Sequence, residues 1–293
     1  MHPMRVLRPA EGIYAFYDGR TEGSRFAEGP NWVDDGALGL GIASYAIVSG
    51  GEAVVYDTHV SVEHARFIRT ALEHEGVRRF TVVLSHWHLD HVAGTAAFQD
   101  CDVVACERTA ELLARLKPAI EQGTLEGPPR IEPLILPSSV FRNRRRLAVG
   151  RLELELIHVN IHSDDATVIW LAARRLLLCG DTMEDTITYV DEPEGLDEHL
   201  VDLAKLRELA PDRILPNHGD PDVIAAGGYT PGLIRATERY IATLLRSRTE
   251  RSLREASLRE LVADSLADGS IHYFAPYEAV RRRNLETILT GAS

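Results

Sequence analysis

The strongest constraint on this chain is the hexapeptide at residues 86–91, His-Trp-His-Leu-Asp-His, which carries three imidazoles and one carboxylate. It follows the apolar run Phe-Thr-Val-Val-Leu at 80–84, which predicts a buried strand. Loops at strand ends are where rigid scaffolds usually present chemical groups, so we expect these side chains to face a cleft. Imidazole together with carboxylate is typical of zinc, iron or manganese sites. A metal site is therefore predicted here, and a polar turn rich in histidine is the alternative.

Three later segments repeat this pattern, in which an apolar strand ends and a potential metal ligand follows. The residues that follow these strands are His162, Asp181 and His218. A lone histidine after a strand is more often a satisfied polar residue than a ligand, so each segment alone is weak evidence. With the hexapeptide, the set contains five histidines and two aspartates, which is about what two metal ions and a bridging group require.

Hydrophobic periodicity predicts strands and helices in two successive runs, each of which begins with strands. A glycine pair indicates a hairpin over 43–56. The helix expected at 61–75 has Ser61 as its N-cap and Gly76 as its stop. The other expected elements are strands at 4–18, 102–105, 151–159 and 213–215, a hairpin at 166–179, and helices at 94–98, 107–116, 196–209, 231 onward, 252–267 and 277–290.

Two segments are expected to lack regular structure. Residues 117–137 contain five prolines and two glycines, and residues 19–41 are rich in glycine and acidic residues. In the 19–41 segment, Trp32 and Phe26 form an apolar wall for a substrate or anchor the loop to the core, and anchoring is favoured. The arginine run at 142–146 meets an anion or forms a solvated turn between strands, and the run at 281–283 recognises an anion or lies on a solvated helix. The solvated option is favoured for both runs.

The remaining histidines are given other roles. His59 follows a strand end, so a place near the site is one of its two options. His158 lies within an alternating strand and is expected to be structural. His272 precedes Pro276 and belongs to a segment that caps the cleft or packs elsewhere. Three histidines on helices are expected at the surface: His64, His74 and His199.

Composition limits the partners that we expect. The formal charge is −12, and an acidic surface repels phosphate backbones, so nucleic acid is not expected as a partner. The sequence shows neither an apolar run as long as a membrane span nor a secretory pattern. Three cysteines without disulfide spacing favour a reducing compartment. We expect a cytoplasmic protein with a small-molecule substrate and no membrane partner, and a homodimer stays open.

The combined ligand pattern resembles the metallo-β-lactamase fold superfamily over about residues 10–225. The resemblance rests on His86-x-His88-x-Asp90-His91, followed in order by His162, Asp181 and His218. It implies that one metal ion is held by His86, His88 and His162, a second by Asp90, His91 and His218, and that Asp181 bridges both. It also implies that Asp57, at the end of its strand, orients the hexapeptide loop.

The same resemblance implies an α+β fold, an αββα sandwich of two mixed β-sheets flanked by helices. The site would lie at one edge, between the sheets. The two runs of strands followed by helices agree with this expectation. We expect a catalytic domain over 1–230 and a C-terminal helical extension over 231–293, packed on the same domain.

The function implied by the resemblance is a dinuclear metal-dependent hydrolase. A hydroxide that bridges two divalent ions, zinc with iron or manganese as alternatives, would attack a small ester-type substrate, with a lactone or thioester favoured. Asp90 and Asp181 are the expected catalytic residues, and Asp90 would orient the nucleophile or accept its proton.

Several departures narrow this function. Some β-lactamases have cysteine or serine where Asp181 stands, and Ser163-Asp164-Asp165 replaces the small-residue turn of glyoxalase-like thioesterases. Tyr189 follows Asp181 by eight positions, so the tyrosine role known in lactonases and a loop role both stay open. The alternatives are an iron-dependent oxidoreductase resembling persulfide dioxygenases, a phosphodiesterase, and a binding protein with little turnover. The complete second ligand set argues against the first and the last.

Overall fold

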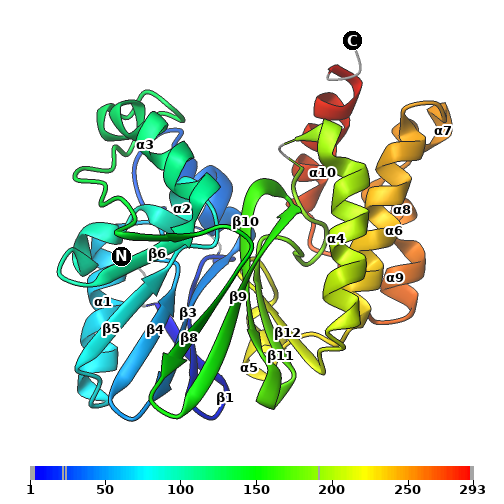
Figure 1. Cartoon of the computed structure of the whole chain (residues 1–293). Coiled ribbons are helices and arrows are strands. Elements are labelled where there is room, and N and C mark those ends of the chain that lie inside the picture. Colours follow the sequence, from blue (N-terminus) through cyan, green and yellow to red (C-terminus); the bar gives the residue numbers. More distant parts are fainter. Residues whose placement is uncertain (1–3, 22, 24, 191, 291–293) are drawn as a thin grey trace.

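The computed structural model describes residues 4–21, 23, 25–190 and 192–290 of the chain. Two β-sheets lie face to face in the middle, and helices cover their outer sides (Figure 1). The longer helices on the first sheet are α1 (Val62–His74) and α3 (Glu107–Gln122), and those beside the second are α4 (Leu196–Glu208), α6 (Gly232–Ser247) and α10 (Tyr277–Thr290). The expected α+β fold, an αββα sandwich, is confirmed.

In the described residues, the first sheet has seven strands in the order β1-β2-β3-β4-β5-β6-β7. Neighbours are antiparallel from β1 to β4 and parallel from β4 to β7, so the sheet is mixed. The parallel strands end at one edge, where the hexapeptide follows β5. The strands are β1 (Arg5–Ala10), β2 (Ile13–Asp18), β3 (Ile42–Ser49), β4 (Glu52–Tyr56), β5 (Arg79–Val83), β6 (Asp102–Cys106) and β7 (Ser139–Phe141).

The described part of the second sheet has five strands in the order β12-β11-β10-β9-β8. Only β11 and β12 pair in parallel among these strands, so this sheet is mixed as well. The parallel pair brings the residues after β11 and β12 to the same edge. The strands are β8 (Arg144–Val149), β9 (Leu152–Ile161), β10 (Ser163–Leu171), β11 (Leu176–Gly180) and β12 (Arg213–Pro216).

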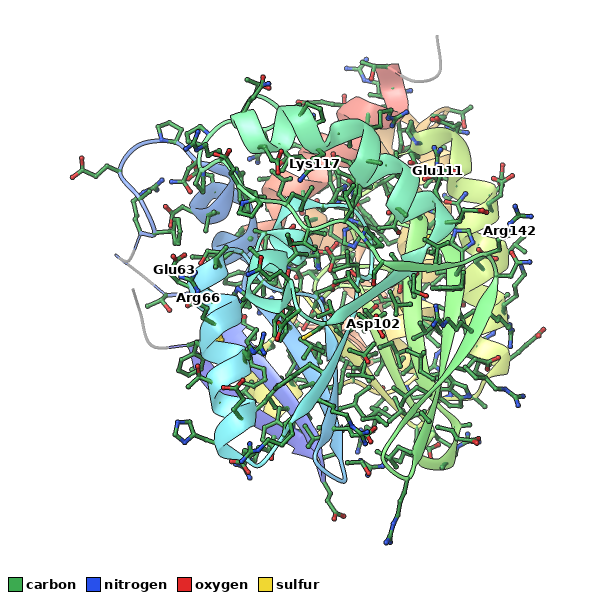
Figure 2. The ribbon with its side chains drawn as sticks, turned by 60° about the vertical axis from the view of Figure 1, so that its left-hand side comes forward. Glu63, Arg66, Asp102, Glu111, Lys117 and Arg142 are labelled. Carbon is green, nitrogen blue, oxygen red and sulfur yellow. The ribbon has the colours of Figure 1, made fainter. Side chains whose placement is uncertain are left out.

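Two large apolar clusters hold the layers together. The first fills the space between the sheets and continues to α4, α6 and α10, and the second lies between the first sheet and α1 and α3. Charged residues lie on the outside: Glu63 and Arg66, labelled in Figure 2, are exposed on α1. Short helices complete the described chain: η1 (Val33–Leu38), α2 (Leu89–Val92), η2 (Thr95–Phe98), η3 (Ala172–Arg174), η4 (Pro193–Gly195), α5 (Pro221–Ala225), α7 (Arg251–Glu255), α8 (Leu258–Leu261) and α9 (Ala263–Ala267).

Local predictions hold where capping or turn chemistry is explicit. The hydroxyl of Ser61 accepts a hydrogen bond from the backbone N–H of His64, as an N-cap should, and Gly76 has a φ of 91° after the helix. The hairpin over 43–56 is present as β3 and β4. The helices expected at 196–209 and 277–290 correspond to α4 and α10.

Three local predictions are wrong. Residues 4–18 form two strands, because Gly12 turns the chain with a φ of 67°. The helix that begins at Glu107 continues through Pro118 to Gln122. Proline in a helix interior costs about 3 kcal/mol, and here Ile120 is buried in the core and Lys117 donates to the Leu134 carbonyl, so packing after the proline holds the helix. The stretch 252–267 is divided into α7, α8 and α9.

The C-terminal helices share the core of the second sheet. Tyr240 and Ile241 of α6 and Tyr277 and Leu285 of α10 belong to the same apolar cluster as its strands. The boundary expected between 230 and 231 stays a prediction. Among the residues that the structure describes, no helix is both long and apolar enough to cross a membrane.

Two of the helix histidines are not at the surface. His74 is exposed as expected, but His64 and His199 are buried. His64 lies 3.0 Å from Asp18 through its Nε2 and 2.8 Å from the hydroxyl of Ser61 through its Nδ1. Both ring nitrogens of His199 lack hydrogen-bond partners among the described residues. The helical pattern alone could not distinguish a histidine that faces the core.

Replacing His199 by leucine should stabilise the protein more in acid than in alkali. Burial lowers the pKa of His199 from 6.5 to about 4, so between these values only the unfolded chain binds the proton and stability falls as the pH falls. Leucine removes this penalty, which is roughly 2 kcal/mol near pH 5 and absent near pH 8. Urea unfolding of both proteins at each pH measures the difference. The exposed His74→Leu variant is the control, and an equal effect of His199→Leu at both pH values would contradict the prediction.

Candidate metal centre

Loops and turns at one edge of the sandwich carry the residues singled out from the sequence. In chain order they are His86 and His88 after β5, Asp90 and His91 on α2, His162 between β9 and β10, Asp181 after β11, and His218 after β12. Gly180 turns the chain into Asp181 with a φ of 57°, and a Cβ there would lie 2.9 Å from the Tyr56 hydroxyl oxygen. Glycine is therefore required immediately before Asp181.

The structure brings all seven side chains together. One group is His86, His88 and His162 and another is Asp90, His91 and His218, and in each group the potential ligand atoms lie within 4.8 Å of one another. In the first group, His162 Nε2 lies 3.0 Å from His88 Nδ1. In the second, Asp90 Oδ2 lies 3.3 Å from His218 Nε2. These groups coincide with the two triads expected from the resemblance.

One carboxylate oxygen, Oδ2 of Asp181, lies between the two groups. It is 3.0 Å from His91 Nε2 and 3.3 Å from His218 Nε2. It is 3.8 Å from both His86 Nε2 and His162 Nε2. An oxygen that faces imidazole nitrogens of both groups has the position that a bridging ligand needs.

Hydrogen bonds on the outer nitrogen orient three of the imidazoles. They join His91 Nδ1 to Asp57 Oδ2 (2.9 Å), His162 Nδ1 to the Tyr189 carbonyl (3.0 Å) and His218 Nδ1 to the Gly41 carbonyl (2.7 Å). A neutral ring that donates from Nδ1 keeps the lone pair of Nε2 available. In all three rings Nε2 faces Asp181, which is the orientation that a metal ligand requires.

Asp57 supports the hexapeptide loop from behind, as expected. Its Oδ1 accepts a hydrogen bond from the backbone N–H of Ser85 (2.6 Å), and its Oδ2 accepts from Nδ2 of Asn217 (2.6 Å) as well as from His91. Asp57 has a φ of 66°, and His162 has a φ of 73°. Non-glycine residues in this left-handed region cost about 1–3 kcal/mol and gather at functional sites. Asn217 had no predicted role, although it adjoins His218.

Burial and the buried carboxylates determine the charges of the site. Burial acts to lower the pKa of His91, but Asp181 and Asp90 outweigh it and raise that pKa well above its usual value. Burial also opposes ionisation of Asp90, but His91 and His218 outweigh it and hold the pKa of Asp90 at about 2. Burial likewise opposes ionisation of Asp181, but His218 and His91 hold the pKa of Asp181 well below its usual value. Asp90 and Asp181 are therefore ionised at neutral pH and require positive charge beside them.

The donor set fits divalent metal ions. Within the described residues, buried Nε2 of His86 and buried Oδ1 of Asp181 have no hydrogen-bond partner. An unpaired buried polar atom costs about 1–3 kcal/mol, so such atoms normally have a partner. Imidazole nitrogens and carboxylate oxygens are preferred by zinc, iron and manganese, and a cation would satisfy both orphaned atoms.

Glu184 is a buried carboxylate of the site that the sequence analysis did not identify. Its Oε1 lies 3.8 Å from His162 Nδ1 and accepts a hydrogen bond from the backbone N–H of Tyr189 (2.9 Å). Its Oε2 accepts from the Tyr277 hydroxyl (3.0 Å). Burial, together with the charge of Asp181, raises the pKa of Glu184 to about 7. Its place three residues after Asp181 was the only signal in the sequence.

A pocket of about 720 Å³ opens on the ligand cluster. Trp32 and Leu40 line it from the 19–41 segment, and Val280 and Arg283 line it from α10, so both segments form its walls. Trp32 also donates from its indole nitrogen to the Pro129 carbonyl (2.9 Å), so it anchors the loop as well as lining the pocket. The other lining residues include Trp87, Ala37, Ala279, Asp35, Glu126 and Tyr189.

Some residues with open roles are not among the described lining residues of this pocket. His59 is buried and stacks on His64, with ring centroids 4.6 Å apart. His272 lies 3.1 Å from Asp185 through its Nδ1 and is absent from the described pocket lining. His158, expected to be structural, lies 2.9 Å from the Asp164 carbonyl through its Nε2. The arginines at 144–146 belong to strand β8, and Phe26 is not among the described lining residues.

Comparison with known proteins gives a consistent result. Residues 38–218, which contain all seven side chains, match the family described as the metallo-beta-lactamase superfamily. A beta-lactamase-like protein 2 homolog of Caenorhabditis elegans is 26% identical over 183 residues, which cover 61% of this chain and 56% of that protein. The homolog of Drosophila melanogaster is 25% identical over 187 residues, which cover 61% and 59%.

The chain thus matches less than two thirds of the length of either curated relative. Among solved structures, a metallo-beta-lactamase from Pontibacter korlensis has a TM-score of 0.57 and 18% sequence identity, and the match covers 79% of this chain and 99% of that one. At this identity the likeness supports the fold alone.

Proposed function

The chain belongs to the metallo-β-lactamase superfamily, and from that premise we propose that it is a dinuclear metal-dependent hydrolase of small lactones or thioesters. The observation that carries the proposal is the position of Asp181, whose Oδ2 faces imidazoles of both histidine groups beside a pocket for a small molecule. A carboxylate shared in this way suits two ions rather than one.

The proposed ligands follow from the two groups. The first metal would be held by His86, His88 and His162, the second by Asp90, His91 and His218, and Asp181 would contact both. Divalent ions bound there would supply Lewis acidity and water with a pKa near 7. The chain would contribute Asp90, which lines the pocket and would orient the attacking water or accept its proton.

The pocket walls support an uncharged substrate with an apolar part. Trp32, Leu40 and Val280 would bind the acyl chain or ring of a substrate and exclude water from the reacting bond. Asp35 and Glu126 line the same pocket together with one cation, Arg283. The two acidic side chains and the formal charge of −12 disfavour an anionic phosphodiester. A neutral lactone or thioester suits these walls better.

A substrate panel tests the proposal. The zinc-loaded protein is assayed with neutral lactones, acyl thioesters and a phosphodiester. We expect hydrolysis of a lactone or thioester that a chelator abolishes and zinc restores, with the phosphodiester cleaved more slowly or not at all. Phosphodiester cleavage alone would overturn the proposed substrate class. Thiol-dependent oxygen uptake by an iron-containing protein would replace the hydrolase by the oxidoreductase alternative.

Replacing Asp57 by asparagine should weaken binding of the second metal. The side-chain amide has only one acceptor oxygen, so it cannot accept from Ser85 on one side and from His91 and Asn217 on the other as the carboxylate does. Loss of such an outer partner typically costs about 10- to 100-fold in metal affinity. Competition with a chromogenic chelator measures the affinity for each metal equivalent.

The matched control for this prediction is Asp18→Asn. Asp18 Oδ2 lies 3.0 Å from His64 Nε2, so these two residues form a second aspartate–histidine pair, which is outside the proposed ligand set. We expect unchanged metal affinity in this control. A similar loss in both variants would mean that Asp57 acts through general stability and not through His91.

A further inference from the structure

The loop over 181–190 lies between the metal centre and the C-terminal helix α10. It follows β11, and all but one of its residues are buried. It begins with Asp181, and near its end the carbonyl of Tyr189 receives the hydrogen bond from His162 Nδ1 (3.0 Å). The position of this loop therefore determines the position of the bridging carboxylate and the orientation of one histidine of the first group.

The loop has no regular secondary structure, so side chains fix its shape. The Thr188 hydroxyl donates to the carbonyl of Asp181 (2.6 Å), which closes the loop on itself. Glu184 accepts from the backbone N–H of Tyr189 (2.9 Å). The first bond joins the two ends of the loop, and the second joins its middle to its end. The middle is also tied to neighbouring segments, because the Tyr229 hydroxyl donates to Asp185 and the Thr186 hydroxyl donates to the His272 carbonyl.

Two buried residues of α10 hold Glu184 and the end of the loop near Tyr189. The Tyr277 hydroxyl donates to Oε2 of Glu184 (3.0 Å). Asn284 donates from Nδ2 to the carbonyl of Thr188 (3.0 Å), and its Oδ1 accepts from the N–H of Val190 (2.9 Å). Residues seven apart lie on one face of a helix, two turns from each other. One face of α10 thus holds both the carboxylate and the backbone of the loop.

A neighbouring face of the same helix lines the substrate pocket. Ala279, Val280 and Arg283 are among the lining residues, whereas Tyr277 and Asn284 are not. Different residues of α10 therefore contact the loop and the pocket, although Val280 lies one turn from both Tyr277 and Asn284. Their effects on the protein can be measured separately.

We propose that Tyr277 and Asn284 are positioning residues, which hold the 181–190 loop so that Asp181 and His162 keep their places at the metal centre. The inference rests on the proposed dinuclear function and adds a role for the C-terminal helix in assembling the centre. Without Asn284, two buried peptide groups lose their partners, and the loop shifts to satisfy them. A displacement of about 1 Å near reacting groups can cost roughly 100-fold in rate.

The test compares Tyr277→Phe and Asn284→Ala with the wild type. Tyr277→Phe removes one hydroxyl and keeps the buried ring, so it keeps the test informative where Asn284→Ala does not fold. The readouts are zinc affinity by chelator competition, the visible absorption spectrum of the cobalt(II)-substituted protein, and the separate values of kcat and KM. We expect about 10-fold or more weaker zinc binding, an altered cobalt spectrum, and a lower kcat with KM within about twofold.

Two further variants separate positioning from other effects. Tyr240→Phe removes a buried hydroxyl on α6 that accepts from Asn284 Nδ2 (3.0 Å) and makes no hydrogen bond to the loop among the described residues. It should lower the unfolding temperature and leave the cobalt spectrum and kcat unchanged. Val280→Trp fills the pocket from α10 without removing a hydrogen bond to the loop, and it should raise KM with zinc affinity unchanged.

The outcomes distinguish the two proposals. If the wild type binds zinc but both loop-facing variants keep its affinity, cobalt spectrum and kcat, the positioning role is wrong and the proposed function stands. The positioning role is also wrong if Tyr240→Phe changes the cobalt spectrum as much as Tyr277→Phe does. If the wild type takes up neither zinc nor cobalt, the proposed function fails, and the inference fails with it.

Discussion

Replacing Asp181 by alanine should remove metal and activity together. Its Oδ2 lies 3.0 Å from His91 Nε2, 3.3 Å from His218 Nε2 and 3.8 Å from His86 Nε2, so no other single atom of the proposed ligand set is shared so widely. Loss of an outer partner of a ligand typically costs about 10- to 100-fold in metal affinity, and loss of a direct ligand to both ions should exceed about 100-fold. Elemental analysis and the hydrolysis rate are measured on the same preparation.

The control for Asp181→Ala is Asp164→Ala. Asp164 lies close to His162 in the chain, but its carboxylate pairs with Arg108 at 2.9 Å on the partly exposed surface. That variant should keep the wild-type metal content and activity. If Asp181→Ala kept two metal ions, Asp181 would not be the bridge, and the orphaned oxygen would need another explanation. If it lost activity alone, Asp181 would act on the substrate and not on the metal ions.

The ligand set could be predicted because its signal is local. Each candidate residue follows an apolar strand, and parallel strands bring such positions to one edge of a sheet. The hexapeptide also places Asp90 and His91 on one short helix directly after β5. The resemblance then added what spacing could not provide, which is the division of these residues into two groups around Asp181.

The supporting residues could not be predicted because their roles depend on tertiary contacts. Asn217 supports the site through Asp57, which is 160 positions away in the chain. Asn284 reaches the backbone of Thr188 across 96 positions. Neither residue has a local pattern, since an asparagine in a loop or on a helix is ordinary. For the same reason, the helical periodicity around His199 did not reveal that its imidazole faces the core.

Removing the metal ions should lower the unfolding temperature by roughly 10 °C. A ligand that binds only the folded state stabilises it by about 4 kcal/mol when the free ligand concentration is about a thousand times the dissociation constant. Each 1 kcal/mol of stability shifts the unfolding midpoint by about 2–4 °C in domains somewhat smaller than this one. The physical reason is the buried, ionised carboxylates, which require cations beside them. Calorimetry before and after chelation measures the shift, and elemental analysis before chelation should give about two metal ions per chain.

Two comparisons decide what this shift means. Zinc should restore the original midpoint, and the Asp181→Ala variant should show little shift on chelation, because it has lost the shared ligand. An equal shift in both proteins would place the stabilising ions elsewhere in the molecule. One iron per chain in place of two divalent ions would fit the oxidoreductase alternative. A mononuclear centre would leave one group of ligands, with Asp181 beside it, without a metal ion. The dinuclear hydrolase needs that second cation.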